Sequence, residues 1–273
     1  MKKMSLLFLL MTTLLQTEVL SQRGNFSAYS HKPDKEYFKS YLTVSKRLVS
    51  FPKRWNGKQW AASGAIIAGG VAIYAFDNEI RTFFQSNKSS SADLASRYFF
   101  EPWGSGVYPV ALFGGIYIYG LASKDQQAQR LALGAAQAFV ISGITVEILK
   151  HLTHRHRPYQ DVPANPRLWE GPFKGFEHTS FPSGHTITVF SLASFVSSVY
   201  NDKPWVGILS YSIAGGVGLQ RIYDDKHWAS DVFIAAALGY GIGKAVYFVF
   251  NSNPNFSMGI SGAGGLSLVY HIK

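Results

Sequence analysis

Six long apolar stretches divide the chain, and polar segments separate them. Glycine, alanine and serine recur throughout these stretches, and such small residues allow helices to pack closely. Tyrosine or tryptophan stands near several of their ends, as in the aromatic belt of a membrane protein. The pattern predicts an all-α fold, a six-helix bundle within residues 58–250, with helices over residues 59–76, 104–123, 131–148, 186–200, 205–219 and 232–250.

The hydropathy of the whole chain bears on where this bundle lies. Its mean value is +0.03, although 47% of the residues are hydrophobic. Six membrane spans in a chain of 273 residues would normally give a higher value. We expect a membrane-embedded bundle, and a water-soluble helical bundle is the alternative.

The N-terminal residues 1–21 have the pattern of a signal peptide. Lys2 and Lys3 precede a short apolar run, and the small residue Ser21 stands just before Gln22, a suitable cleavage point. The apolar run is short for a helix that crosses a bilayer. We expect a cleaved signal, with an uncleaved N-terminal anchor as the alternative.

The remaining flanks are polar or rich in glycine. Within the polar segment 22–57, residues 34–49 predict an amphipathic helix that lies on the membrane or on the bundle. The tail, residues 251–273, contains repeated glycines, and its run LSLVYHI (residues 266–272) predicts a strand.

Composition and charge narrow the chemistry. The chain has no cysteine, which excludes disulfides and thiolate catalysis. Its formal net charge is +10, and the basic residues are spread along loops instead of forming one tail. We interpret this charge as suited to phosphate-bearing lipids or small phosphate esters, and expect no nucleic-acid partner.

Three polar clusters interrupt the apolar pattern, and each stands at the end of a predicted helix. If the helices are successive antiparallel neighbours, all three clusters reach the same end of the bundle. The clusters are KHLTHRHRP with Lys150 and Arg157, FPSGH with Ser183, Gly184 and His185, and RIYDDKHWASD with Arg221, His227 and Asp231.

These residue types suit a phosphate group. Its oxygens can be bound by arginine guanidinium groups, each of which donates two hydrogen bonds, by a lysine, and by the free backbone N–H groups at two helix N-termini. One histidine can attack phosphorus while the other protonates the leaving oxygen. Because positions four apart share a helix face, Asp231 is expected to hydrogen-bond His227 and fix its ring.

The spacing Lys-x6-Arg-Pro, Pro-Ser-Gly-His and Arg-x5-His-x3-Asp resembles the three-part signature of the type-2 phosphatidic acid phosphatase superfamily. That superfamily also contains bacterial class A acid phosphatases and vanadium haloperoxidases. The resemblance covers residues 150–231, about a third of the chain. One position departs from the pattern, because Gln220 stands where the family usually has serine.

The resemblance implies a role for each residue. His227 would attack phosphorus and become phosphohistidine, Asp231 would orient it, and His185 would protonate the departing alkoxide and then activate water. No metal or other cofactor is implied. The phosphoryl oxygens would be bound by Lys150, Arg157, Ser183, Gly184 and Arg221.

The implied function is hydrolysis of a phosphate monoester or pyrophosphate, carried by a lipid, at a periplasm-facing site in a bacterial-type cell envelope. A soluble periplasmic acid phosphatase of broad small-ester specificity is the alternative, and a vanadate-dependent haloperoxidase a weaker one because the chain is short. A scaffold or transporter would be expected to lack part of the signature. One conflict follows: six spans after a cleaved signal would leave Lys150 on the cytoplasmic side.

Three further interpretations concern residues near the clusters. His154 and His156 are expected on the basic rim of the site and not as metal ligands, because no acidic partner stands at a ligand spacing. Asp77 is interpreted as a helix-end charge. The long loop 159–181 is expected to cover the site and help select the leaving group.

Overall fold

The computed structural model describes residues 31–172, 174–175, 177–251, 256–260 and 266–270. The predicted all-α architecture is confirmed, and the tail, for which the sequence predicts one strand, contains a two-stranded hairpin. The elements in chain order are α2 (Lys35–Ser50), the 3₁₀ turn η1 (Phe51–Arg54), α3 (Gly57–Ala75), α4 (Asp77–Ser86), α5 (Ser90–Ala95), the π-helical turn η2 (Ser96–Phe100), α6 (Glu101–Gly104), α7 (Val107–Ala122), α8 (Gln126–Thr153), α9 (Gly184–Val199), α10 (Pro204–Tyr223), α11 (Ala229–Asn251), β1 (Phe256–Ile260) and β2 (Leu266–Tyr270).

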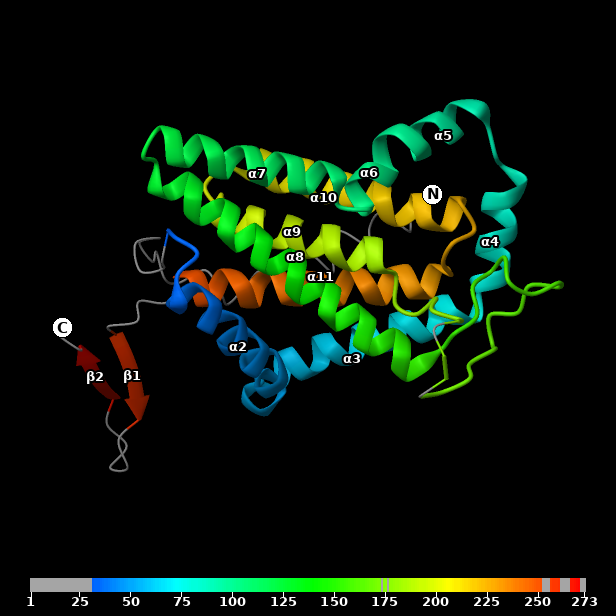
Figure 1. Cartoon of the computed structure of the whole chain (residues 1–273). Coiled ribbons are helices and arrows are strands. Elements are labelled where there is room, and N and C mark those ends of the chain that lie inside the picture. The colour runs from blue at the N-terminus through cyan, green and yellow to red at the C-terminus, as the bar shows by residue number, and fades with distance from the viewer. Residues whose placement is uncertain (1–30, 173, 176, 252–255, 261–265, 271–273) are drawn as a thin grey trace.

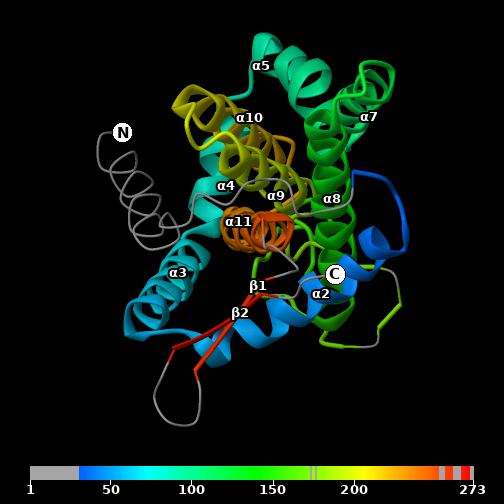
Figure 2. The ribbon, with the colours of Figure 1, turned by 90° about the vertical axis from the view of Figure 1, so that its left-hand side faces the viewer.

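Each of the six predicted apolar helices is present, as α3, α7, α8, α9, α10 and α11. Helix α9 packs against α8, α10 and α11 and is the central element of the bundle. Figure 2 shows α9 and α11 in its middle, with the other long helices around them. This arrangement explains why α9 is buried along most of its length.

Glycines allow the close approach of α9 and α11. A Cβ atom on Gly239 would collide with the carbonyl oxygen of Ile187, and one on Gly243 would collide with that of Ser191. The two helix backbones therefore lie nearly in contact, as the abundance of small residues predicted.

Helix α2 confirms the predicted amphipathic helix. Its N-cap, Asp34, accepts a hydrogen bond of 2.9 Å from the backbone N–H of Tyr37. The buried Tyr37 side chain in turn donates to the carbonyl oxygen of Leu133 in α8, at 3.1 Å. Helix α2 therefore packs on the bundle and is not a separate appendage.

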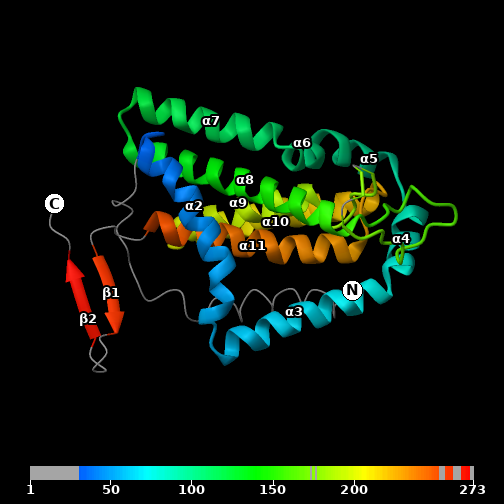
Figure 3. The same cartoon turned by 60° about the horizontal axis from the view of Figure 1, so that its bottom comes forward.

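Sharp bends shape the segment before α7. Helices α3 and α4 meet at 60°, and the stretch Ser90–Gly104 meets α7 at 51°. Figure 3 shows α3 running along the bundle to α4, at the end where the loop between α8 and α9 also lies. The bends bring α4 and α6 beside the three polar clusters.

The helices have the length and composition of a membrane protein. Within the described residues, α8 and α11 are long and apolar enough to cross a membrane, and up to four spans result if each bent pair counts as one. Many large apolar side chains of the bundle are exposed, among them Ile67, Val71, Val110, Ile118, Ile144 and Ile208. The bundle therefore has a membrane location, although this count is lower than the six spans expected.

The C-terminal tail contains the strand that the sequence predicts. The predicted C-terminal strand is present as β2, which pairs antiparallel with β1 so that Phe256 lies opposite Tyr270. The predicted signal peptide, residues 1–21, lies outside the described residues and stays a prediction, as does the division of the chain into domains.

Candidate functional site

The three polar clusters meet at one end of the bundle, where α8 and α10 end and α9 and α11 begin (Figure 1). Lys150 lies in the last turn of α8 and Arg221 in the last turn of α10. Ser183 is the N-cap of α9. His227, expected at the start of α11, instead precedes this helix by two residues, because α11 begins at Ala229.

The start of α9 is built to approach an anion. The Ser183 hydroxyl caps the helix, accepting from Thr186 N at 3.4 Å. Gly184 has no side chain, and a Cβ there would lie 3.6 Å from the Lys150 ammonium nitrogen. The first N–H groups of a helix have no partner within the helix and carry its positive dipole end. The Ser183 oxygen accepts in this cap and its O–H can still donate, so Ser183, the backbone N–H groups and Lys150 are the groups that an anion would meet here.

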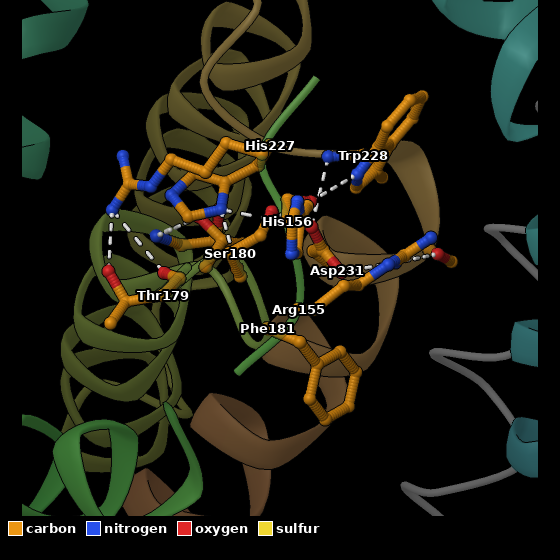
Figure 4. A network of polar contacts seen from close by, with 12 residues as sticks. Arg155, His156, Thr179, Ser180, Phe181, His227, Trp228 and Asp231 are labelled. Atoms are coloured by element: carbon orange, nitrogen blue, oxygen red, sulfur yellow. Dashed lines mark hydrogen bonds and ion pairs between the residues drawn. The ribbon is translucent and has the colours of Figure 1, made fainter. Parts of the chain in front are cut away.

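His227 is held in one tautomer by a backbone carbonyl (Figure 4). Its Nδ1 lies 2.7 Å from the carbonyl oxygen of Ser180. A carbonyl can only accept, so Nδ1 carries the proton and Nε2 keeps its lone pair. Burial, together with the positive charges of Arg157 and Arg221, lowers the pKa of His227 well below its usual value. The lowered pKa favours the neutral ring, in which Nε2 carries the lone pair.

The predicted hydrogen bond between Asp231 and His227 is not formed. The carboxylate oxygen Oδ2 of Asp231 lies 3.9 Å from His227 Nδ1, because His227 precedes the helix and does not share its face. Asp231 instead accepts from the Ser180 hydroxyl at 2.6 Å and from Trp228 N at 3.0 Å. Asp231 therefore contacts Ser180, whose carbonyl holds the ring, more closely than it contacts the ring itself.

A buried ion cluster that the sequence did not predict lies behind His227. Arg155 is fully buried and donates to Asp231 Oδ1 through Nη1 and to Asp77 Oδ2 through Nη2, the latter at 2.7 Å. Asp77 also accepts from Ser230 N at 2.9 Å. Asp77 does stand at a helix end, as interpreted, because it is the first residue of α4. Its carboxylate is in addition a buried partner of Arg155, which the sequence did not indicate.

Arg157 and Arg221 keep donors directed toward the site. Among the described residues, the side chain of Arg157 makes only long hydrogen bonds, from Nη2 to the Thr179 carbonyl at 3.3 Å and to its hydroxyl at 3.4 Å. Among the described residues, Arg221 Nε is buried without a hydrogen-bond partner. A buried donor of this kind is costly unless something satisfies it, and a bound oxyanion would do so.

Glu101, at the start of α6, is a site residue that sequence reasoning missed. Its Oε1 lies 3.0 Å from His185 Nε2, and its Oε2 accepts from Arg221 Nη1. Gln220, the position that departs from the family pattern, also donates to Oε2, at 2.9 Å. No local pattern marked Glu101, because only the bend between α6 and α7 brings it to this end of the bundle.

The two rim histidines have unexpected surroundings. His154 is buried, not on a rim, and its two ring nitrogens lie 2.9 Å and 2.8 Å from the carbonyl oxygens of Gly171 and Gly175. His156 Nδ1 lies 2.9 Å from an oxygen of Asp161, and its Nε2 lies 3.3 Å from Glu170. Acidic partners therefore do reach His156, from the folded loop and not from a local spacing.

Comparisons with known proteins agree with the resemblance. Residues 131–254 match the family model described as the PAP2 superfamily. The chain is 38% identical over 76 residues to the lipid A 1-phosphatase of Porphyromonas gingivalis, covering 28% of this chain and 17% of that protein. It is 28% identical to the bacitracin transport permease protein BcrC of Bacillus licheniformis, covering 52% of this chain and 65% of that protein.

Among solved structures, the chain is similar to LpxE of Aquifex aeolicus, with a TM-score of 0.47 and 23% identity over 62% of this chain and 92% of that one. The alignments to the two curated relatives span less than two thirds of either relative's own length.

Proposed function

Because residues 131–254 match the model of the PAP2 superfamily, we propose that the chain is a phosphatase that hydrolyses a phosphorylated lipid through a phosphohistidine intermediate. The observation that carries the proposal is the state of His227. Its imidazole favours the neutral form with the proton on Nδ1 and lies close enough to Lys150, Arg157 and Arg221 for their charges to depress its pKa. A nucleophile surrounded by three cations suits attack on a phosphate and few other substrates.

The first half of the reaction forms the covalent intermediate. Lys150, Arg157 and Arg221 bind the phosphoryl oxygens together with Ser183 and the N–H groups at the start of α9, where Gly184 allows close approach. His227 Nε2 attacks phosphorus, and the bond between phosphorus and the leaving oxygen breaks. His185 donates a proton to that oxygen, and the lipid product leaves as an alcohol.

The second half regenerates the enzyme. His185, now deprotonated, takes a proton from a water molecule, and the resulting hydroxide attacks phosphorus. The bond between phosphorus and His227 Nε2 breaks and inorganic phosphate is released. The fixed cations supply the charge stabilisation, so the chemistry needs no metal ion.

Two observations favour a lipid over a small ester. The bundle has exposed apolar helices and a membrane location, and a relative over 76 residues is a lipid A 1-phosphatase. A pyrophosphate on a lipid fits the same chemistry. We propose a site that faces the periplasm. We also propose that the loop 159–181 helps select the leaving group, since its C-terminal end contacts Arg157 through Thr179 and holds His227 through the Ser180 carbonyl.

The experiment measures phosphate release by the full-length protein in detergent, without added metal ions. The substrates are phosphatidate, an isoprenyl pyrophosphate, a lipid A phosphate and a soluble aryl phosphate. His227→Ala tests the nucleophile, and rapid quenching with a ³²P-labelled substrate tests for acid-labile, base-stable label on the protein. We expect His227-dependent release from at least one lipid.

The outcomes separate the alternatives. Equal release from the aryl phosphate would favour a broad acid phosphatase, and release that persists in His227→Ala would refute the assigned nucleophile. Peroxide-dependent halide oxidation after addition of vanadate, without phosphate release, would favour the haloperoxidase.

A further inference from the structure

A cluster of metal-ligating atoms lies in the loop between α8 and α9, apart from the groups assigned to phosphate. It consists of His156, Glu170 and His178, whose ligand atoms all lie within 4.8 Å of one another. We propose that this cluster binds one Zn²⁺ ion, which joins the two chain segments that border the site. The proposal concerns binding and does not depend on the phosphatase activity.

The distances fit a zinc coordination shell. Zinc binds histidine nitrogen and carboxylate oxygen at about 2.0–2.2 Å in a tetrahedron, so neighbouring ligand atoms stand about 3.3–3.5 Å apart. Glu170 Oε1 lies 3.3 Å from His156 Nε2 and 3.5 Å from His178 Nε2. Both edges therefore match those of a tetrahedral site.

The two imidazole rings stack face to face. Their centroids are 3.6 Å apart and their planes differ by 3°. A histidine nitrogen binds zinc through a lone pair that lies in the plane of its ring, and one ion cannot lie in two parallel planes. Binding of one ion by both histidines therefore requires the His178 ring to rotate about its side-chain bonds, with its Nε2 kept near Glu170.

Asp161 supports His156 as a metal ligand. Its carboxylate lies 2.9 Å from His156 Nδ1 and so accepts a hydrogen bond from a proton on that nitrogen, which leaves the Nε2 lone pair for a metal. A carboxylate behind a ligating histidine is the usual arrangement at zinc sites. Together, Asp161 and Glu170 would neutralise the two charges of the ion. Water, or the carboxylate of Glu177 at 3.9 Å from His178 Nε2, can take the fourth position.

The position of the cluster gives the ion a structural role. His156 precedes Arg157 and its carbonyl accepts from the Trp228 indole at 2.8 Å (Figure 4). His178 has a φ of +56°, a left-handed conformation that histidine adopts at some cost, and it leads directly to Thr179 and Ser180. A zinc ion would therefore fix the position of Arg157 relative to the Ser180 carbonyl.

The test uses the full-length protein in detergent after treatment with a chelator. Zn²⁺ binding is measured by calorimetry, and Co²⁺ serves as a probe because tetrahedral nitrogen and oxygen ligands give it strong visible absorption. We expect one submicromolar Zn²⁺ site per chain and a rise in the thermal unfolding midpoint on the order of 5 °C at saturation.

Variants identify the ligands. Glu170→Gln and His178→Ala should abolish the Co²⁺ absorption, and Asp161→Asn should weaken Zn²⁺ binding about tenfold or more. His151→Ala is the matched control, because this histidine lies in α8 outside the cluster, with its Nδ1 2.7 Å from the Glu147 carbonyl oxygen. Equal Zn²⁺ binding by all variants, or no submicromolar binding by the parent protein, would overturn the proposal. Loss of phosphatase activity with metal binding intact would concern the proposed function alone.

Discussion

The two arginines of the RHR sequence, Arg155 and Arg157, offer a paired test of the site. They stand two residues apart, and the first is assigned to a buried ion cluster whereas the second is assigned to phosphate. Arg155 is fully buried between Asp77 and Asp231, whereas the side chain of Arg157 is partly exposed and, among the described residues, makes only long hydrogen bonds with Thr179. Arg155→Met keeps most of the side-chain volume and leaves two buried carboxylates without their cation.

The magnitude follows from that uncompensated charge. Removing one partner of a buried ion pair costs about 3–5 kcal/mol, and Arg155 also donates twice to the Pro166 carbonyl, at 3.1 and 2.9 Å. For a chain of this size, each kcal/mol lowers the unfolding midpoint by about 2–4 °C. We therefore expect Arg155→Met to lower the midpoint by at least about 6 °C.

Arg157→Met is the control in the same assay, thermal unfolding in detergent followed by circular dichroism. Its unfolding midpoint should change by less than about 2 °C, since a partly exposed contact contributes little, whereas phosphate release should fall at least about a hundredfold. Equal unfolding midpoints for the two variants would refute the assignment of Arg155 to the buried cluster. Full activity of Arg157→Met would refute its assignment to phosphate.

Three further predictions test other parts of the structure. The folded-state pKa of His227 lies well below its usual value, so the unfolded chain binds the extra proton first as the pH falls. Stability should decrease below about pH 6.5, and His227→Gln should flatten that dependence in unfolding midpoints measured across pH; an unchanged profile would contradict the buried neutral ring. Glu101→Gln removes a negative charge beside the anion site, so steady-state kinetics should show a lower KM. It also removes the carboxylate partner of His185, so kcat should fall about tenfold or more. An unchanged kcat would argue against a role of Glu101 in positioning His185. Gly239→Ala places a Cβ against the α9 backbone and should lower the free energy of unfolding by about 1–3 kcal/mol. Gly215 has open space around it, so Gly215→Ala should not destabilise the protein. Equal unfolding midpoints for the two variants would contradict the close packing of α9 and α11.

The agreement between sequence and structure is greatest where local pattern decides the outcome. Long apolar segments must become helices in order to satisfy their backbone groups away from water, so all six helices could be located from the sequence. Because Lys150, Gly184 and Arg221 stand at helix ends, an antiparallel bundle brings them together whatever the details of its packing.

The side-chain partners could not be predicted in the same way, because they depend on how distant segments turn. Arg155 and Arg157 are chemically identical, and only the path of the chain after α8 buries the first and leaves the second beside the site. His227 finds the Ser180 carbonyl instead of Asp231 because α11 begins two residues later than the i, i+4 spacing assumed.

The sequence by itself therefore determined the helices, the end of the bundle where the polar clusters meet and the residue types available there. Only the tertiary structure decided which groups touch. It brought Glu101 to His185 through the bend before α7, and it gathered His156, Glu170 and His178 from one long loop. The physical reason is the distance along the chain over which each interaction acts. Helix formation and burial follow from the periodicity of neighbouring residues. A hydrogen bond or a metal site instead needs angstrom-scale placement of residues that are far apart in the chain.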